Sequence, residues 1–278
     1  MSLYIASINS GSNGNCYYVG NDSEAILVDA GISCRETEKR MNKLGLSMQK
    51  VKALFISHEH SDHISGVAVL SRKYRLPVYI TPATLTSSRL ELEHDLVNTF
   101  KAYEAVEIGK LAITAFPKFH DAAHAHSFVV RSKDITIGVF TDIGIACDHL
   151  KSQFAQCHAA FLEANYDEVM LENGRYPYHL KRRISGGLGH LSNKQALELF
   201  ISHRPPYMSH LLLSHLSRDN NKPELVQELF NQHANGTEIV VASRYQESAV
   251  YFVDGLKQNE RKPLNKITET VQVQYSLF

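Results

Sequence analysis

The stretch of sequence that decides the fold is HEHSDH, residues 58–63, directly after the apolar run VKALFIS at residues 51–57. Four potential metal ligands fall within this hexapeptide: His58, His60, Asp62 and His63. Side chains alternate along a strand, so the histidines at 58 and 60 point the same way, and the ligands at 62 and 63 are aimed at a neighbouring point. Imidazoles suit zinc, manganese or iron, whereas carboxylates suit harder ions. The hexapeptide therefore predicts a site for two metal ions rather than a solvated histidine-rich loop.

The composition is that of a globular chain with an unusual share of histidine. The 278 residues include 15 histidines and no tryptophan, with 44% hydrophobic and 21% charged residues. This balance excludes an intrinsically disordered chain. Lys+Arg and Asp+Glu number 29 each. The resulting net charge of zero argues against a protein that coats nucleic acid by bulk charge, but not against a local basic groove.

Cysteine usage and apolar patterning favour a cytoplasmic protein. The four cysteines have no CxxC or zinc-ribbon spacing, which is typical of scattered, reduced thiols. The opening MSLYIASINSGSNGNC has neither the basic nor the apolar region of a signal peptide, and no apolar run approaches the length of a membrane span. We therefore expect no membrane association. The sequence indicates no oligomeric state.

Short strand-like runs alternate with helix-like runs along most of the chain, which predicts a layered α/β domain. We expect a single domain over residues 1–256 and a polar, loosely attached tail over 257–278. Strands are expected within residues 3–8, 16–19, 25–31, 51–57, 77–81, 105–116, 127–140, 158–163, 209–214, 238–242 and 247–253. Helices are expected at residues 34–44, 63–74, 146–156, 192–203 and 222–233. The most irregular stretch is 172–191, and Ser192 with Gln195 has the pattern of a capping box.

The H-x-H-x-D-H run is the signature of the metallo-β-lactamase superfamily, and the rest of the chain resembles that superfamily in order. The resemblance implies a four-layer αββα sandwich with the metals in a cleft at one edge of the two sheets. It matches further motifs to this chain: Asp29 in ILVDAG, which would support the metal loop, His120 in KFHDAAH, Asp142 in FTDIG as a bridging carboxylate, and His215 in LLLSHLS. His124 and His126 compete with His120 for its role, and His190 and His210 compete with His215.

By that resemblance, each ion would have four ligands. Metal one would be held by His58, His60, His120 and Asp142. Metal two would be held by Asp62, His63, Asp142 and His215. Two such cations lower the pKa of a bridging water and polarise a phosphoryl or carbonyl oxygen, so no serine or cysteine nucleophile is needed. The cofactors would be two divalent ions per chain, either zinc or manganese or iron.

Two ligand positions narrow the chemistry that the resemblance implies. Aspartate at position 142, rather than cysteine, points away from true β-lactamases and toward phosphodiesterases and thioester hydrolases. Histidine at position 60 argues against the di-iron oxygen reductases of the superfamily, which usually carry glutamate there.

Longer stretches resemble the WalJ/YycJ subgroup of the superfamily, a group of cytoplasmic bacterial proteins. The more discriminating are GHLSN at residues 189–193 and HLSRDNN at 215–221. This resemblance implies 5′→3′ exonuclease activity on double-stranded DNA. The chain departs from the subgroup after HDAA, where His124-Ala125-His126 replaces the usual Glu-Pro.

Candidate catalytic and substrate-binding residues surround these motifs. We expect Asp62 and His190 to act in catalysis, with His190 protonating the leaving oxygen or binding a phosphate, unless it is only a loop residue. The basic, aromatic segment 175–183 suits DNA backbone contact and base stacking, with a solvated loop as the alternative. The expected substrate-binding residues are Asn15, Glu163, Asn165, Arg175, Lys181, Arg182, Arg218 and Asn221. The last two either hold a terminal phosphate or form a plain helix-entry turn.

Three hypotheses of function follow. The first is a metal-dependent nuclease with DNA as its substrate, which the basic segment and HLSRDNN favour. The second is a small-molecule hydrolase acting on a cyclic phosphodiester, a lactone or a thioester, which the neutral net charge favours slightly. The third is a non-catalytic regulatory protein, which predicts poor metal retention although all seven candidate ligands are present.

Overall fold

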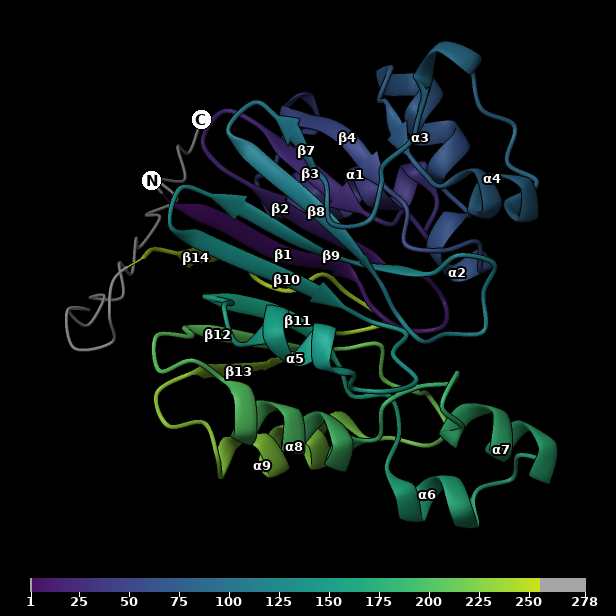
Figure 1. Ribbon diagram of the computed structural model, residues 1–278, viewed down its shortest axis with the longest axis vertical. Helices are drawn as coiled ribbons and strands as arrows, with labels where there is room; N and C mark the ends of the chain where they lie inside the picture. Colours follow the sequence, from purple (N-terminus) through teal and green to yellow (C-terminus); the bar gives the residue numbers. More distant parts are fainter. Residues whose placement is uncertain (1, 256–278) are drawn as a thin grey trace, which may run out of the picture.

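Two seven-stranded sheets pack face to face in the computed structural model, which describes residues 2–255 (Figure 1). The first sheet contains, in spatial order, β14 (Tyr251–Val253), β1 (Leu3–Asn9), β2 (Cys16–Gly20), β3 (Ala25–Val28), β4 (Val51–Phe55), β5 (Val78–Tyr79) and β6 (Val97–Asn98). The second contains β13 (Glu238–Val241), β12 (His210–Ser214), β11 (Ala159–Glu163), β10 (Ile135–Phe140), β9 (His126–Ser132), β8 (Leu111–Pro117) and β7 (Ala105–Ile108). The expected tail, 257–278, lies outside the described residues.

Each sheet has an antiparallel part and a parallel part. In the first sheet the pairs from β14 to β3 are antiparallel and those from β3 to β6 are parallel. In the second sheet the pairs from β7 to β10 are antiparallel and those from β10 to β13 are parallel. Parallel strands end at the same edge, so the loops after β3, β4, β10, β11 and β12 are delivered to one end of the molecule. That end carries the candidate site.

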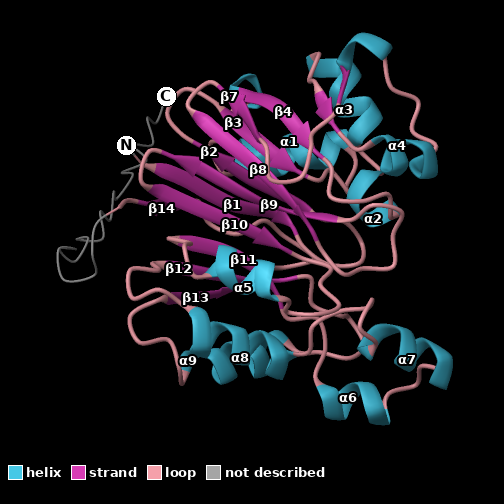
Figure 2. Ribbon diagram, in the orientation of Figure 1, coloured by secondary structure: helices cyan, strands magenta, loops and turns pink. Residues whose placement is uncertain are grey.

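Helices cover both outer faces of the sheet pair (Figure 2). On the first sheet lie α1 (Cys34–Lys43), α2 (Ser61–Ile64), α3 (Val67–Tyr74) and α4 (Pro82–Ser88). On the second lie α5 (Asp148–Phe154), α8 (Asn193–His203) and α9 (Pro223–Asn231). Two further helices, α6 (Glu168–Asn173) and α7 (Tyr178–Ser185), stand apart from the layers at the site end. The expected αββα sandwich is therefore confirmed.

The layers are held by three buried apolar clusters. One fills the space between the two sheets, where the rings of Tyr17 and Phe161 lie 4.8 Å apart. The second packs the outer face of β10–β13 against α5, α8 and α9, and the third packs the first sheet against α1 and α3. Burial of apolar surface on both faces of each sheet supplies the main driving force for this arrangement. It also explains why the parallel strands read as continuous apolar runs.

The structure differs from the sequence-based expectation in several elements. The single helix expected at 63–74 is divided into α2 and α3 at Gly66, where a Cβ atom would lie 2.0 Å from the Ile32 carbonyl oxygen. The irregular stretch 172–191 contains the whole of α7. Helix α4 was not expected, and the last expected strand is shortened to Tyr251–Val253. The capping box is confirmed at the start of α8, where the Ser192 and Gln195 side chains each bond the other's backbone.

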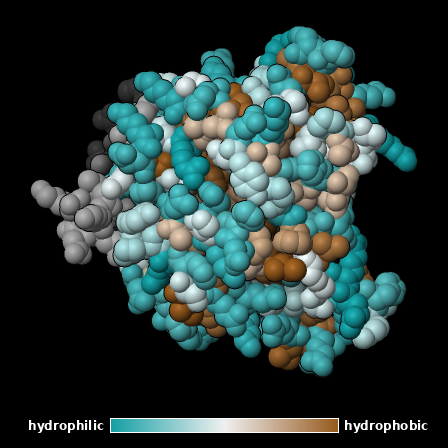
Figure 3. Space-filling view, viewed as in Figure 1, coloured by the Kyte–Doolittle hydropathy of each residue, from teal (hydrophilic) through white to brown (hydrophobic). Residues whose placement is uncertain are grey.

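Hydrophilic residues cover most of the face shown in Figure 3, with apolar residues in small separate patches. Within residues 2–255, none of the helices combines the length and the apolar character that crossing a membrane requires.

Candidate metal centre

Strand ends deliver most of the side chains of the candidate site. His58 and His60 follow β4, Asp142 follows β10, and His215 comes directly after β12. The backbone of Asp142 and of His215 is left-handed, with φ of 56° and 57°, and that of Asp29 after β3 has a φ of 60°. Left-handed backbone is uncommon outside glycine and is tolerated best by residues such as asparagine, aspartate and histidine. Each of these residues lies just beyond the end of its strand, at the end of the molecule that carries the site.

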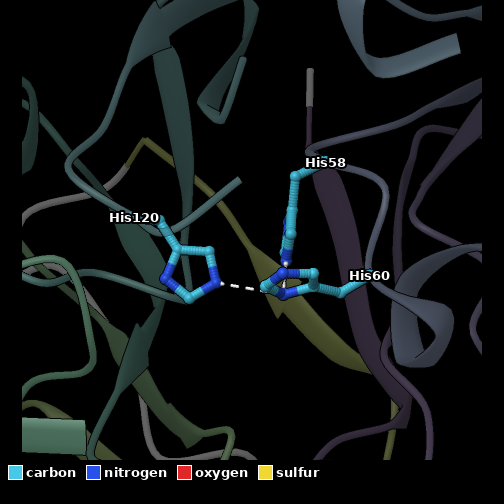
Figure 4. Close-up of side chains that lie close together, drawn as sticks. All are labelled: His58, His60 and His120. Carbon is cyan, nitrogen blue, oxygen red and sulfur yellow. Dashed lines mark hydrogen bonds between the residues drawn. The ribbon is translucent and has the colours of Figure 1, made fainter. Parts of the chain in front are cut away.

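Three histidines form the first group of donors (Figure 4). His60 Nδ1 lies 3.1 Å from His58 Nε2 and 3.3 Å from His120 Nε2. His58 and His60 belong to the loop after β4, whereas His120 comes from the loop between β8 and β9 in the other sheet. The three nitrogens converge on one point, as the ligands of a single ion would.

The second group is built from Asp62, His63 and His215. Asp62 Oδ2 lies 3.6 Å from His63 Nε2 and 3.4 Å from His215 Nε2. Asp142 lies between the groups: its Oδ2 is 3.2 Å from His63 Nε2, and its Oδ1 is 3.8 Å from His120 Nε2. All seven residues expected to hold metal are therefore brought together, with Asp142 reaching both groups.

Outer hydrogen bonds orient the histidines so that one ring nitrogen of each faces inward. Asp29 Oδ2 lies 2.7 Å from His63 Nδ1, and its Oδ1 accepts the Ser57 backbone N–H. The Ser57 hydroxyl lies 2.8 Å from His58 Nδ1, and the carbonyl of Gly189 lies 3.1 Å from His120 Nδ1. Such partners fix the tautomer and the ring orientation of metal-binding histidines. Asp29 thus contacts both Ser57, just before the HEHSDH run, and His63 at its end.

Glu163 has a comparable role on the other side of the site. Its Oε1 lies 2.9 Å from His215 Nδ1 and 2.8 Å from His190 Nδ1. Its Oε2 accepts the backbone N–H groups of Ile143 and Leu191. The side chain is completely buried, so the expectation that Glu163 contacts substrate is wrong. It is a positioning carboxylate for two histidines.

Asn15 is also buried, and it supports the metal loop. Its backbone N–H donates to the Asp62 carbonyl at 2.7 Å, and its Nδ2 lies 3.2 Å from Asp62 Oδ2. The neighbouring Gly31 permits this approach, because a Cβ there would lie 1.7 Å from the Asp62 carbonyl oxygen. With an exposed fraction of 0%, Asn15 does not reach a substrate, contrary to expectation.

The site concentrates negative charge in a buried place. Burial would lower the pKa of His63, but the carboxylates of Asp142, Asp29 and Asp62 outweigh this and raise it to about 10. Burial also opposes the shift at His215, yet Asp142, Asp62 and Glu163 raise its pKa well above the usual value. Without metal, two histidines therefore carry the protons that balance these acids. A dication is the natural replacement for such protons.

The donor set fits divalent metal ions. Imidazole nitrogens and carboxylate oxygens form four groups within residues 2–255 whose ligand atoms lie within 4.8 Å of one another. Asp142 Oδ2 is buried, and within that same range its charged neighbour is His63 Nε2, 3.2 Å away but outside hydrogen-bond geometry. A buried carboxylate oxygen without a donor is costly unless a cation neutralises it. The bridging position of Asp142 is where a cation would do so.

A cavity of about 250 Å³ opens over the donors. Its lining includes Asp62, Asp142 and His190, together with Tyr176 and Arg183 from α7 and the segment before it. His190 Nδ1 is hydrogen-bonded to Glu163, so Nε2 is the ring nitrogen that remains available to an occupant of the cavity. The cavity therefore offers ligands, an imidazole and a cation to an occupant.

The basic segment contributes differently from what its sequence suggested. Arg175 and Arg182 are exposed, with Arg182 beside the Tyr178 ring, and Lys181 donates to the Glu172 carbonyl. None of these three is among the residues that line the metal cavity. Helix α7 turns the side chain of the next residue, Arg183, toward the site instead.

The remaining expected substrate residues belong to the loops after β11 and β12. Asn165 lines the metal cavity and donates to the His215 carbonyl at 2.8 Å. The Asn221 amide is buried and committed to the carbonyls of Ala164 and Asn165. It therefore stabilises the turn, which is the plain alternative considered for it. Arg218 is exposed and lines a neighbouring cavity.

Three site residues were not expected from the sequence: Ser57, Asp121 and Arg183. Ser57 links Asp29 to His58 through its hydroxyl. Asp121 Oδ1 lies 3.6 Å from His120 Nε2, and its Oδ2 accepts from Arg183 Nε at 2.5 Å. Serine before the HEHSDH run and aspartate after His120 are local signals that could have indicated the first two. No local signal separates Arg183 from its basic neighbours.

The family assignment follows from comparison with known proteins. A family model described as the β-lactamase superfamily domain matches residues 24–215. The structure of the metallo-β-lactamase fold protein YhfI from Bacillus subtilis superposes with a TM-score of 0.70 at 15% identity, covering 91% of this chain and 100% of that chain. With this fold and this cluster of histidines and carboxylates, the chain belongs to the metallo-β-lactamase superfamily, whose fold implies divalent-metal binding.

Within the superfamily, the chain is similar to two proteins along most of its length. The exodeoxyribonuclease YycJ of Bacillus anthracis is 35% identical over 239 residues, covering 84% of this chain and 89% of the relative. The exodeoxyribonuclease WalJ of Streptococcus pneumoniae is 32% identical over 221 residues, covering 78% and 82%. The resemblance to the WalJ/YycJ subgroup is thereby confirmed.

Proposed function

We propose that this protein is a two-metal exonuclease that degrades double-stranded DNA in the 5′→3′ direction. The observation that carries the proposal is the position of Asp142, which reaches both donor groups at the base of an open cavity. Two-metal sites of this kind suit the in-line displacement of a phosphodiester. The names of the YycJ and WalJ relatives give DNA as the substrate class to be tested.

The ligands divide between two ions. His58, His60, His120 and Asp142 would hold the first. Asp62, His63, Asp142 and His215 would hold the second. When bound, the two cations lower the pKa of a water molecule and polarise a phosphoryl oxygen. The two metal positions would hold zinc, manganese or iron. These ions share the same ligand set, so their availability decides which of them is bound.

The protein's own groups complete the chemistry. His190 would hold a proton at Nε2 for the departing sugar oxygen, while the Glu163 carboxylate on its Nδ1 stabilises the charged imidazole. Asp62 lies in the cavity lining beside His63 and His215, and its carboxylate would hold one ion where the substrate enters. Arg183, also in the lining, would attract the DNA backbone into the cavity.

The test is to purify the protein with its native metal and measure metal content per chain and cleavage of end-labelled duplex DNA with added Mn²⁺. We expect two ions per chain and stepwise shortening of the strand from its 5′ end. Substrates labelled at the 5′ end or at the 3′ end distinguish this direction from 3′→5′ degradation. Asp142→Asn is the inactive control. Fewer than two ions with no cleavage of DNA, or activity on thioesters alone, would refute the proposal.

A further inference from the structure

A second cavity lies next to the last candidate ligand of the metal centre. Its volume is about 340 Å³, and its lining includes Ser217, Arg218, Ser243, Arg244 and Tyr245. Ser217 also lines the metal cavity, so the two spaces meet at that residue. Sites for small molecules begin at about 300 Å³, so this space is large enough for a phosphorylated nucleoside unit.

Hydrogen bonds join this cavity to the metal centre. Ser10, in the cavity lining, accepts the backbone N–H of His215 at 2.8 Å, and its own N–H donates to the Ser243 carbonyl at 3.1 Å. His215 and Arg218 are three residues apart, which spans at most about 11 Å of extended chain, or about three steps of a B-DNA strand at about 3.4 Å per step. An occupant would therefore lie within a few nucleotides of the metals.

The charge of the lining favours an anion. It contains two guanidinium groups, from Arg218 and Arg244, and no carboxylate. Arg244 Nη1 is buried and, among the residues that the structure describes, lacks a hydrogen-bond partner, while Nη2 lies 3.4 Å from the Ser12 hydroxyl. Arg183 in the metal cavity is, by contrast, already paired with Asp121. The planar, charged N–H groups of a guanidinium match the acceptor oxygens of a phosphate.

We propose that this second cavity binds the 5′-terminal phosphate of the DNA strand being degraded, with Arg218 and Arg244 as the residues that hold it. The proposal rests on the proposed exonuclease function and deepens it, since it explains how the enzyme would recognise a chain end. Tyr245, whose side chain is 74% exposed at the cavity, provides a stacking surface for the terminal base.

The test compares two duplexes of one sequence, one with a 5′-phosphate and one with a 5′-hydroxyl. The proteins are the parent, Arg218→Gln, Arg244→Gln, and Arg72→Gln as the matched control, because Arg72 is exposed on α3 away from both linings. The parent should prefer the phosphorylated duplex by about tenfold or more in kcat/KM, the worth of a charge-assisted contact. Each cavity variant should lose that preference, while the control keeps it. Hydrolysis of bis-p-nitrophenyl phosphate by Arg72→Gln should stay within about twofold of the parent.

Two outcomes would overturn the proposal: a parent without preference for the phosphorylated duplex, or an equal loss on both duplexes in the cavity variants. Binding of the phosphorylated duplex, made uncleavable by phosphorothioate linkages, is measured on the same proteins by fluorescence anisotropy. The cavity variants should bind it about tenfold more weakly. Selective binding of the 5′-phosphorylated duplex without cleavage would contradict the exonuclease function and support the cavity assignment. Cleavage without preference for the 5′-phosphate would support the exonuclease function and contradict the cavity assignment.

Discussion

Glu163 Oε1 lies 2.8 Å from His190 Nδ1, and this contact connects the candidate proton donor to the metal centre. The same oxygen is 2.9 Å from Nδ1 of His215, a candidate ligand. Burial would raise the pKa of Glu163, but His190 and His215 outweigh it and lower the pKa to about 2. One buried carboxylate thus orients both imidazoles.

Glu163→Gln should lower activity on duplex DNA by about 10- to 100-fold, the usual effect of removing a partner behind a ligand. The neutral amide keeps the size of the side chain but no longer stabilises a charged imidazole. The rate profile against pH should change as well as the rate, since the substitution removes a buried negative charge 2.8 Å from His190 Nδ1 and 2.9 Å from His215 Nδ1. Glu228→Gln, on the exposed face of α9, is the control. An unchanged profile with a merely lower melting temperature would indicate a structural role only.

His190→Gln separates proton transfer from metal binding. His190 also lies within a donor group with Asp142, Glu163 and His215, so the geometry alone permits a ligand role. As a general acid, its loss should lower kcat by about 10²- to 10⁴-fold while two ions per chain remain. Metal content by mass spectrometry and kcat are measured together, with the exposed His94→Gln as control. Loss of one ion in His190→Gln would contradict the assignment.

The sequence predicted most of the site because its ligands sit in short local patterns. HEHSDH follows one apolar strand, and Asp29, Asp142 and His215 each follow the end of another strand. Strand periodicity and the family resemblance together indicate these positions. The left-handed backbone at the last three was not predictable, since it depends on the turn between two packed layers. The αββα architecture came from the resemblance rather than from the alternation of elements alone.

Long-range contacts account for what the sequence missed. Glu163 and Asn15 were expected to bind substrate, but their partners lie across the fold, and burial rather than residue type decides their roles. The stretch 172–191 contains several glycines and a proline, which favour loops. Leu180 and Ile184, four residues apart and both in the cavity lining, were the available signal for α7.

Metal binding should release protons and weaken as the pH falls. The carboxylates around His63 raise its pKa to about 10 against the effect of burial, and that of His215 is also raised, so at pH 7.5 both hold protons in the metal-free protein. A metal ligand must be a neutral imidazole, and the bound state therefore carries fewer protons. Calorimetric titration in buffers of different ionisation enthalpy should give about two protons released when both ions bind. Proton uptake, or affinity that rises on acidification, would contradict this charge balance.

Removing the metal should destabilise the protein, because the ions bind the folded site and offset the repulsion of its carboxylates. At a free metal concentration of about 1,000 Kd the expected stabilisation is about 4 kcal/mol, or a melting temperature higher by about 10 °C. Thermal unfolding is followed before and after chelation, and after metal is restored. Asp142→Asn should show a much smaller difference, since it loses the group shared by both ions. An equal difference in parent and variant would mean that Asp142 does not bridge.

Arg183 and Arg182 form a matched pair of neighbouring arginines on α7 that differ only in where they point. Arg183 lines the metal cavity and contacts Asp121, whereas Arg182 is exposed beside Tyr178. Arg183→Gln should raise KM for duplex DNA by about tenfold, because one charge-assisted contact to the backbone is lost, and Arg182→Gln should change it little. Hydrolysis of bis-p-nitrophenyl phosphate, which has no extended backbone for Arg183 to hold, should fall less in Arg183→Gln than cleavage of duplex DNA does. KM values that rise equally in both variants would assign the effect to the overall charge of the helix, and an unchanged KM in Arg183→Gln would remove this residue from the DNA-binding surface.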